Sequence, residues 1–272
     1  MPFEKEMIEN ETVPASFFLH CSNRNLNDTI TFNFPFSTFN YSDTESHFAI
    51  NERKGNTMRY NTILFDFDGT LYDTVEGITK SIQFALHRHG IDEPLEALRC
   101  FAGPPLVDKF MEVYGVDKAL AEQLVLDFRE RYQPIGVYES APFPGVGETL
   151  LRLRKAGLTL GVATSKPQAL AELLLDRAGL RDRFDVIVGS KPGINNDAKW
   201  AIVREAMALC GAEPAATVLV GDTKYDAIGA ARAGIACIGA GWGYAAPGEL
   251  EAAGVVRTAR DFDELEGILL DN

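Results

Sequence analysis

Two acidic residues at the end of an apolar run offer the clearest chemistry in the chain. They are Asp66 and Asp68 of Asp66-Phe-Asp-Gly-Thr70, which follows an apolar stretch from Thr62. If that stretch is a strand, both carboxylates emerge at its C-terminal edge, where buried acids are costly without a cation. Asp66 is ionised at neutral pH and can attack phosphorus without a base, and Asp68 can protonate a leaving alcohol and then deprotonate water. The alternative is that the two acids cap a turn.

A second pair of acids, Asp222 and Asp226, follows another apolar run. Residues four apart share a helix face, so this pair can complete an oxygen site for Mg²⁺ if a helix starts at once. Thr164 ends a third apolar run, and its hydroxyl can donate a hydrogen bond to a phosphoryl oxygen, with Ser165 the weaker candidate by position. Structural roles compete here: Asp222 and Thr164 can each N-cap the next helix, and Asp226 can be a solvated helix acid.

The elements that must position these residues alternate regularly. From Thr62 onward, short apolar runs and longer amphipathic segments follow one another, which is typical of βα units around a parallel sheet. Right-handed crossovers then predict an α/β fold with a doubly wound parallel sheet. We expect strands at 62–67, 158–163, 184–188, 217–220 and 235–238, and helices at about 169–178, 197–209 and 226–233, with a last helix after the capping box at 261–264.

The segment between the first two strands has a helical period instead. Val75, Ile78, Ile82 and Leu86 recur at helical spacing. We expect a helical cap domain over residues 74–140, inserted into an α/β core of residues 58–73 and 141–272 and lying over the C-terminal strand ends, where such sheets bind ligands. Its loop 101–106, which contains Gly103, either faces the phosphate and helps select the substrate or is a turn between helices.

Together these motifs resemble those of the haloacid dehalogenase superfamily of phosphatases. The resemblance rests on Asp66-Phe-Asp-Gly-Thr-Leu-Tyr-Asp73, Val162-Ala-Thr-Ser-Lys-Pro167 and Val220-Gly-Asp-Thr-Lys-Tyr-Asp226, and it covers about residues 58–272. With loop 101–106, the chain is similar to the phosphoglycolate-phosphatase-like branch, which has a helical cap. The resemblance implies Mg²⁺ held by the Asp66 carboxylate, the Asp68 main-chain carbonyl and the Asp222 carboxylate, with Asp226 as an outer or water-mediated partner.

A lysine is also required, to neutralise the transferring phosphoryl group and to keep Asp66 ionised. Two lysines are available. Lys191 stands in a Lys-Pro pair but follows the predicted strand almost immediately, whereas Lys199 begins the next helix, where the lysine of this superfamily usually stands. We favour Lys199 and leave Lys191 open, because the chain departs here from the common Lys-Pro-x-Pro pattern.

Composition restricts the partners. A formal charge of −13 repels nucleic acids and anionic membranes, so we expect neither as a partner, and the anionic substrate needs a local cation. The four cysteines have no metal-ligand spacing, and no signal peptide or apolar span is recognisable, so we expect a cytoplasmic protein. Residues 1–57 differ in composition from the remainder, and we interpret them as a disordered leader or as untranslated sequence ahead of a start at Met58.

The sequence predicts a Mg²⁺-dependent phosphatase for a small phosphomonoester such as phosphoglycolate, a nucleoside monophosphate or a sugar phosphate. The alternatives are a phosphotransferase or phosphomutase with the same aspartates and a non-catalytic binding protein on the same scaffold. Phosphonate cleavage would need a cap lysine that forms an imine, for which Lys80 and Lys109 are available. Neither the substrate nor the oligomeric state is specified by these motifs.

Overall fold

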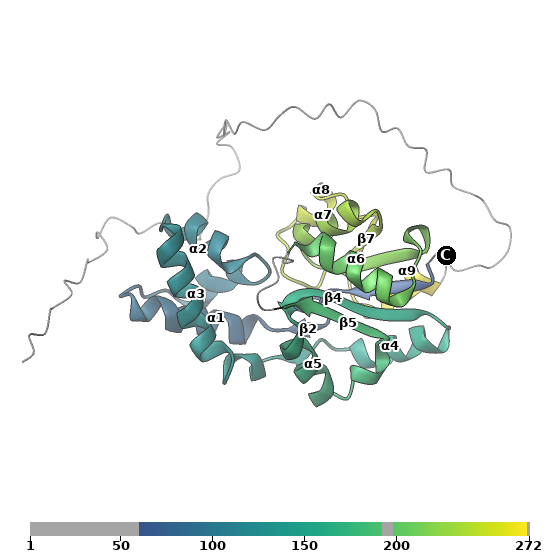
Figure 1. Ribbon diagram of the computed structural model, residues 1–272, viewed down its shortest axis with the longest axis horizontal. Coiled ribbons are helices and arrows are strands. Elements are labelled where there is room, and N and C mark those ends of the chain that lie inside the picture. Colours follow the sequence, from purple (N-terminus) through teal and green to yellow (C-terminus); the bar gives the residue numbers. More distant parts are fainter. Residues whose placement is uncertain (1–59, 192–197, 271–272) are drawn as a thin grey trace, which may run out of the picture.

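The computed structural model describes residues 60–191 and 198–270, so the predictions for residues 1–57 and for a start at Met58 lie outside the described residues. A six-stranded sheet forms the centre, with strand order β5-β4-β1-β6-β7-β8 and parallel pairing throughout (Figure 1). The predicted α/β fold with a parallel sheet is confirmed. The strands are β1 (Thr62–Phe65), β4 (Thr159–Pro167), β5 (Val186–Ser190), β6 (Thr217–Gly221), β7 (Ala236–Ala240) and β8 (Arg257–Ala259).

Helices cover both faces of this sheet. Those of the core are α4 (Val146–Lys155), α5 (Gln168–Arg177), α6 (Lys199–Cys210), α7 (Lys224–Ala233), α8 (Glu249–Ala252) and α9 (Phe262–Leu270). Side chains of β1 alternate between the two faces: Ile63 and Phe65 pack with α4, α5 and α9, whereas Leu64 packs with α6 and α7. Both faces of β1 are therefore buried, which explains its continuous apolar sequence.

A group of helices between β1 and β4 lies beside the core (Figure 1). It consists of α1 (Val75–Arg88), η1 (Leu95–Phe101), α2 (Leu106–Tyr114), α3 (Lys118–Tyr132) and η2 (Gly136–Tyr138), of which η1 and η2 are short 3₁₀ helices. The chain enters and leaves this group through an antiparallel pair of two-residue strands, β2 (Tyr72–Asp73) and β3 (Ala141–Pro142). We call the residues between these strands the cap.

Some expected boundaries are wrong. Helix α7 begins at Lys224 rather than at Asp226, because Thr223 is its N-cap and forms a capping box with Asp226. Asp222 thus precedes the helix and does not cap it. Strand β4 extends to Pro167, beyond the expected 163, and β2, β3 and β8 were not expected at all; each has only two or three residues, too few to show a period. Residue 197, the expected start of α6, lies outside the described residues.

Candidate active site

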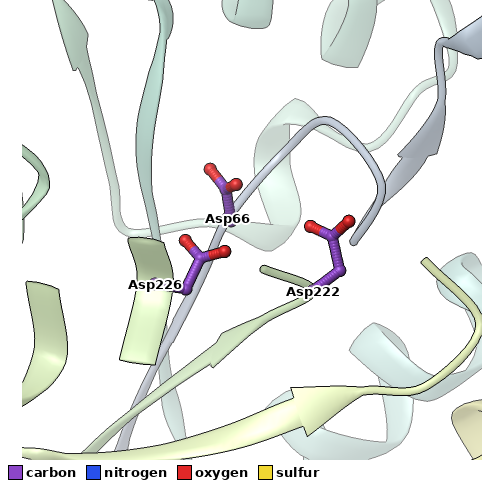
Figure 2. A group of neighbouring side chains, drawn as sticks. All are labelled: Asp66, Asp222 and Asp226. Atoms are coloured by element: carbon purple, nitrogen blue, oxygen red, sulfur yellow. The ribbon is translucent and has the colours of Figure 1, made fainter. Parts of the chain in front are cut away.

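Three carboxylates meet at the C-terminal edge of the sheet. Asp66 follows β1, Asp222 follows β6, and Asp226 lies in the first turn of α7. The backbone N–H of Asp66 donates to the Val220 carbonyl at 2.9 Å, which continues the pairing of β1 with its neighbour β6. One oxygen from each carboxylate lies within 4.8 Å of the others, and Figure 2 shows the three side chains pointing in the same general direction from their separate segments. Pairing of β1 with β6 therefore brings together Asp66 and Asp222, which are 156 positions apart in the sequence.

Lys199 lies among these acids. Its Nζ is 2.7 Å from Oδ1 of Asp66 and 2.7 Å from Oδ1 of Asp226, and its side chain is 8 % exposed. Lys199 is the first residue of α6, and α6 packs against α7 at Gly229, where a Cβ would lie 2.6 Å from Cγ of Lys199. Glycine at position 229 therefore leaves room for the Lys199 side chain to extend to the carboxylates.

The other candidate lysine has a different neighbour. Lys191 forms an ion pair with Glu205 on α6 and does not line the cavity described below. The two cap lysines are also paired at the surface of the cap: Lys80 contacts Glu76 and Glu139, and Lys109 contacts Glu112. The structure therefore brings Lys199, and not these three, to Asp66.

Burial of several acids together shifts their ionisation. Desolvation, together with nearby Asp226, raises the pKa of Asp66 to about 6 against the lowering effect of Lys199. Desolvation also raises the pKa of Asp222 well above its usual range, with Asp226 and Asp66 adding to the shift. Burial would lower the pKa of Lys199, but Asp226 and Asp66 outweigh burial and hold it above its ordinary value. One ammonium for three clustered carboxylates leaves negative charge for another cation.

The donor set fits a hard cation such as Mg²⁺. Oδ1 of Asp66 is buried and, despite the Lys199 ammonium nearby, accepts no hydrogen bond of good geometry from the described residues. Asp222 lies in a cradle of backbone, since a Cβ on Gly69 or on Gly243 would come within 2.1 Å or 2.2 Å of its side chain. Carboxylate oxygens held rigidly in this way are the ligands that Mg²⁺ prefers.

Asp226 is less available to a metal than the other two acids. Its Oδ2 accepts hydrogen bonds from the Thr223 backbone N–H at 3.0 Å and from the Thr223 hydroxyl at 2.8 Å, and its Oδ1 pairs with Lys199. Both oxygens are thus engaged. The contacts of Asp222 differ, because the Thr70 hydroxyl donates to Oδ1 and the Tyr244 backbone N–H donates to Oδ2, which orients the carboxylate without an ion pair.

A cavity of about 600 Å³ opens beside this cluster, between cap and core. Asp66 and Asp68 line it together with Thr164 and Ser165. Thr164 is buried, and its hydroxyl helps to lower the pKa of Asp66, whereas Ser165 is exposed. From the cap side, Gly103 lines the cavity with a φ of 102°, and a Cβ there would lie 2.9 Å from Cγ2 of Thr223. Loop 101–106 therefore closes against the core beside the acids.

Comparison with known proteins identifies the family. The family model of the haloacid dehalogenase-like hydrolases matches residues 63–240. The chain belongs to the haloacid dehalogenase-like hydrolases. It is 41 % identical over 213 residues to a 5'-nucleotidase of Pseudomonas aeruginosa, covering 78 % of this chain and 96 % of the relative. It is 33 % identical over 210 residues to the tyrosine-protein kinase PtkA of Mycobacterium tuberculosis, covering 76 % and 72 % of the two chains.

A solved structure agrees with this assignment. The crystal structure of a predicted phosphatase from Clostridium acetobutylicum superimposes with a TM-score of 0.75 at 36 % identity, and the match covers 78 % of this chain and 99 % of that one. This haloacid dehalogenase-like hydrolase is therefore a phosphatase that acts on phosphate esters. No helix among the described residues is long and apolar enough to span a membrane.

Several residues of this hydrolase's site escaped the sequence analysis. Lys166 was read only as part of a motif, yet its Nζ lies 2.8 Å from Oδ1 of Asp68. Tyr244 and Trp242 follow β7, and their contacts fix the segment after Asp68: the Tyr244 hydroxyl accepts from the Thr74 N–H at 2.7 Å, and the Trp242 indole donates to the Thr70 carbonyl at 3.0 Å. A sequence signal did exist, because residues 241–244 form a Gly-Trp-Gly-Tyr run directly after a predicted strand.

Proposed function

We propose that the enzyme hydrolyses nucleoside 5'-monophosphates through a phosphoryl group carried transiently on Asp66, with Mg²⁺ as cofactor. The observation that carries this proposal is the meeting of Asp66 with Lys199 and Asp222 beside a cavity that Asp66, Lys199 and Asp68 line. A nucleophile, a cation, a metal site and an acid are the parts that phosphoryl transfer to a carboxylate requires.

The first step is an in-line displacement. A carboxylate oxygen of Asp66 attacks phosphorus, the bond from phosphorus to the ester oxygen breaks, and the leaving alkoxide takes a proton from the Asp68 carboxyl group. In the second step, water attacks phosphorus and gives a proton to the Asp68 carboxylate. The bond from phosphorus to Asp66 then breaks, inorganic phosphate leaves, and both aspartates return to their starting state.

Charge on the transferring group needs compensation inside this acidic site. Lys199 supplies one positive charge beside Asp66, and the Thr164 hydroxyl, with Ser165 beside it, supplies hydrogen bonds to phosphoryl oxygens. Mg²⁺ held by the Asp66 carboxylate, the Asp68 carbonyl and the Asp222 carboxylate would neutralise further charge on the phosphoryl oxygens. Asp226 acts from outside this set by holding Lys199 at 2.7 Å.

The cavity supports the substrate class. Its volume of about 600 Å³ is typical of a site for a ligand larger than a two-carbon acid. Aromatic side chains line it from both sides, Phe101 and Phe128 from the cap and Trp200 and Tyr225 from the core. Trp200 and Tyr225 are each 36 % exposed and can stack on a nucleobase, whereas Phe101 and Phe128 are buried in the cap. The name of the Pseudomonas aeruginosa relative points to the same class.

A panel of phosphate esters tests the proposal. With Mg²⁺ present, we expect kcat/KM for adenosine and cytidine 5'-monophosphates to exceed the values for phosphoglycolate and glucose 6-phosphate by about 10-fold or more. A preference for phosphoglycolate would contradict the substrate class. A phosphotransferase, which the kinase relative's name keeps in view, would pass the phosphoryl group to an added alcohol or peptide instead of water. Stoichiometric release of free phosphate without any acceptor distinguishes the two.

A further inference from the structure

Lys166 is a buried ammonium that the proposed phosphoryl transfer does not use. Its side chain is 2 % exposed, and its Nζ donates to Oδ1 of Asp68 at 2.8 Å and to the hydroxyl oxygen of Tyr132 at 2.7 Å. The ammonium also lies over two aromatic rings, 5.3 Å from the centroid of Phe67 and 5.2 Å from that of Tyr132. Contacts of this kind hold a flexible side chain in one position.

The cage around this ammonium comes from three elements. Lys166 lies on β4, Asp68 and Phe67 follow β1, and Tyr132 is the last residue of cap helix α3. Phe67 stacks on Tyr72 at 4.6 Å, so its ring is itself fixed, and Tyr132 stacks on Phe128 at 4.9 Å. The cap must therefore lie against the core for the cage to be complete. Ionic contacts outweigh burial and raise the pKa of Lys166, so it remains charged.

In this geometry, one oxygen of the Asp68 carboxylate stays available for proton transfer. Lys166 contacts Oδ1, and the Asp68 side chain is 21 % exposed toward a cavity that it lines. An aspartate side chain without such a partner can adopt several rotamers, and proton transfer requires the acid within hydrogen-bond distance of the leaving oxygen. The Lys166 ammonium restricts the Asp68 rotamer only while Tyr132 of the cap holds it, and this requires contact between cap and core.

We propose that Lys166 is a positioning residue for proton transfer: its ammonium fixes the Asp68 carboxylate through Oδ1, and Tyr132 of the cap holds the ammonium in place. The inference rests on the proposed function, since it takes Asp68 as the group that exchanges a proton with the leaving oxygen. It adds that docking of the cap and readiness of the acid are coupled.

The test compares two leaving groups. Adenosine 5'-monophosphate releases an adenosine alkoxide that needs a proton, whereas p-nitrophenyl phosphate releases p-nitrophenolate, which needs none, and neither substrate has a second anionic group. We expect Lys166→Met to lower kcat/KM on the order of 10²-fold for adenosine 5'-monophosphate and less than about 5-fold for p-nitrophenyl phosphate. Because kcat/KM reports the steps up to the first irreversible one, slow hydrolysis of the phosphoenzyme does not disturb this ratio.

Further variants locate the effect. Tyr132→Phe removes only the hydroxyl and should shift the ratio in the same direction by about 5-fold. In an Asp68→Asn background, Lys166→Met should cause no further loss with adenosine 5'-monophosphate, because the group that it positions is already absent. Lys191→Met and Tyr138→Phe serve as matched controls, since Lys191 pairs with Glu205, Tyr138 is 42 % exposed, and neither residue lines the cavity.

Three results would overturn the inference. An equal loss for both substrates would make Lys166 a fold-stabilising or phosphate-binding residue. A rise in KM confined to esters with a second anion, such as phosphoglycolate, would make it a substrate-binding residue. An additive loss in the Asp68→Asn background would separate it from Asp68. If Lys166→Met lowers the melting temperature too far, the ratio is read from Tyr132→Phe. Failure of the proposed function is distinguishable, because the wild-type enzyme itself would then release little phosphate from adenosine 5'-monophosphate.

Discussion

At the scale of single residues, the site depends on one ammonium shared between two acids. Lys199 is 2.7 Å from both Asp66 and Asp226, so Asp226 holds the lysine beside Asp66, the proposed nucleophile. Asp226 is in turn fixed by the Thr223 hydroxyl and N–H. Positioning contacts therefore run from Thr223 through Asp226 and Lys199 to Asp66, the proposed nucleophile.

The two candidate lysines can be compared directly. We expect Lys199→Ala to lower kcat on the order of 10²-fold or more at saturating Mg²⁺, because a charge next to the transferring phosphoryl group is lost. Lys191→Ala should remain within a few-fold of wild type, since Lys191 pairs with Glu205 and does not line the cavity. Phosphate release measured for both variants checks this, and a crippled Lys191→Ala would contradict the assignment of Lys199.

Local chemistry explains which of these residues could be predicted. Asp66, Asp68 and Asp222 follow apolar runs, so their place at strand ends is visible in the sequence. Lys166 gives no such sign, because it lies where the register of β4 with β5 shifts, between Ala163 and Pro167, and strand periodicity does not predict such a shift. Tyr132 is equally hidden, since the end of a cap helix reaches the site only through tertiary packing.

At the scale of elements, the contact between α6 and α7 places the lysine. Gly229 of α7 faces Lys199 of α6, and a Cβ there would lie 2.6 Å from Cγ and 2.9 Å from Cβ of the lysine. Helices can approach this closely only where a side chain is absent. The glycine therefore lets Lys199 pack against α7, although it lies in the middle of a helix, where glycine lowers stability.

Adding a methyl group at this contact should therefore damage catalysis. We expect Gly229→Ala to lower kcat by about 10-fold or more, because the displaced lysine no longer matches the phosphoryl group. Gly147→Ala is the matched control: it also lies in a helix, its Cβ would meet nothing nearer than Leu180 Cδ2 at 3.6 Å, and it should leave kcat unchanged. Phosphate release and melting temperature are measured together, and an unaffected kcat in Gly229→Ala would contradict the role of the contact.

The order of elements was more predictable than their edges. Alternating apolar and amphipathic segments indicated the parallel sheet, because every central strand is buried on both faces and reads as a continuous apolar run. Periodicity could not show β2 and β3, which have two residues each and form through pairing across the cap. Helix α7 begins at Lys224, before the expected start at residue 226, because Thr223 rather than Asp222 occupies the N-cap position.

At the scale of the whole molecule, the protein has a formal charge of −13, and the site at which we expect an anionic substrate is itself acidic. In the folded protein the pKa of Asp66 rises from 3.8 to about 6, and that of Asp222 rises further from its usual range. A raised carboxyl pKa means that the folded state binds a proton that the unfolded chain releases. Stability present below about pH 4 is therefore lost as pH rises through about 6, unless a cation replaces the proton.

Removing one of these charges should stabilise the metal-free protein. In the presence of a chelator, we expect Asp222→Asn to melt above wild type at pH 7.5 on the order of 3 °C or more, and the difference to shrink at pH 5, because a carboxyl group whose pKa is raised binds a proton more readily as the pH falls. Added Mg²⁺ should raise the melting temperature of wild type more than that of the variant. Equal destabilisation of the variant at both pH values would argue against a strained acid cluster.

The central claim is that Asp66 carries the phosphoryl group, and trapping that intermediate tests it most directly. Asp68→Asn removes the base that activates water, whereas p-nitrophenyl phosphate needs no acid to leave, so this pair should accumulate phosphoenzyme. After acid quench and proteolysis, mass spectrometry should find one added phosphoryl group on Asp66, and none in the Asp66→Asn, Asp68→Asn double variant. A phosphoryl group on another residue, or a burst of p-nitrophenol without any phosphoenzyme, would contradict the account.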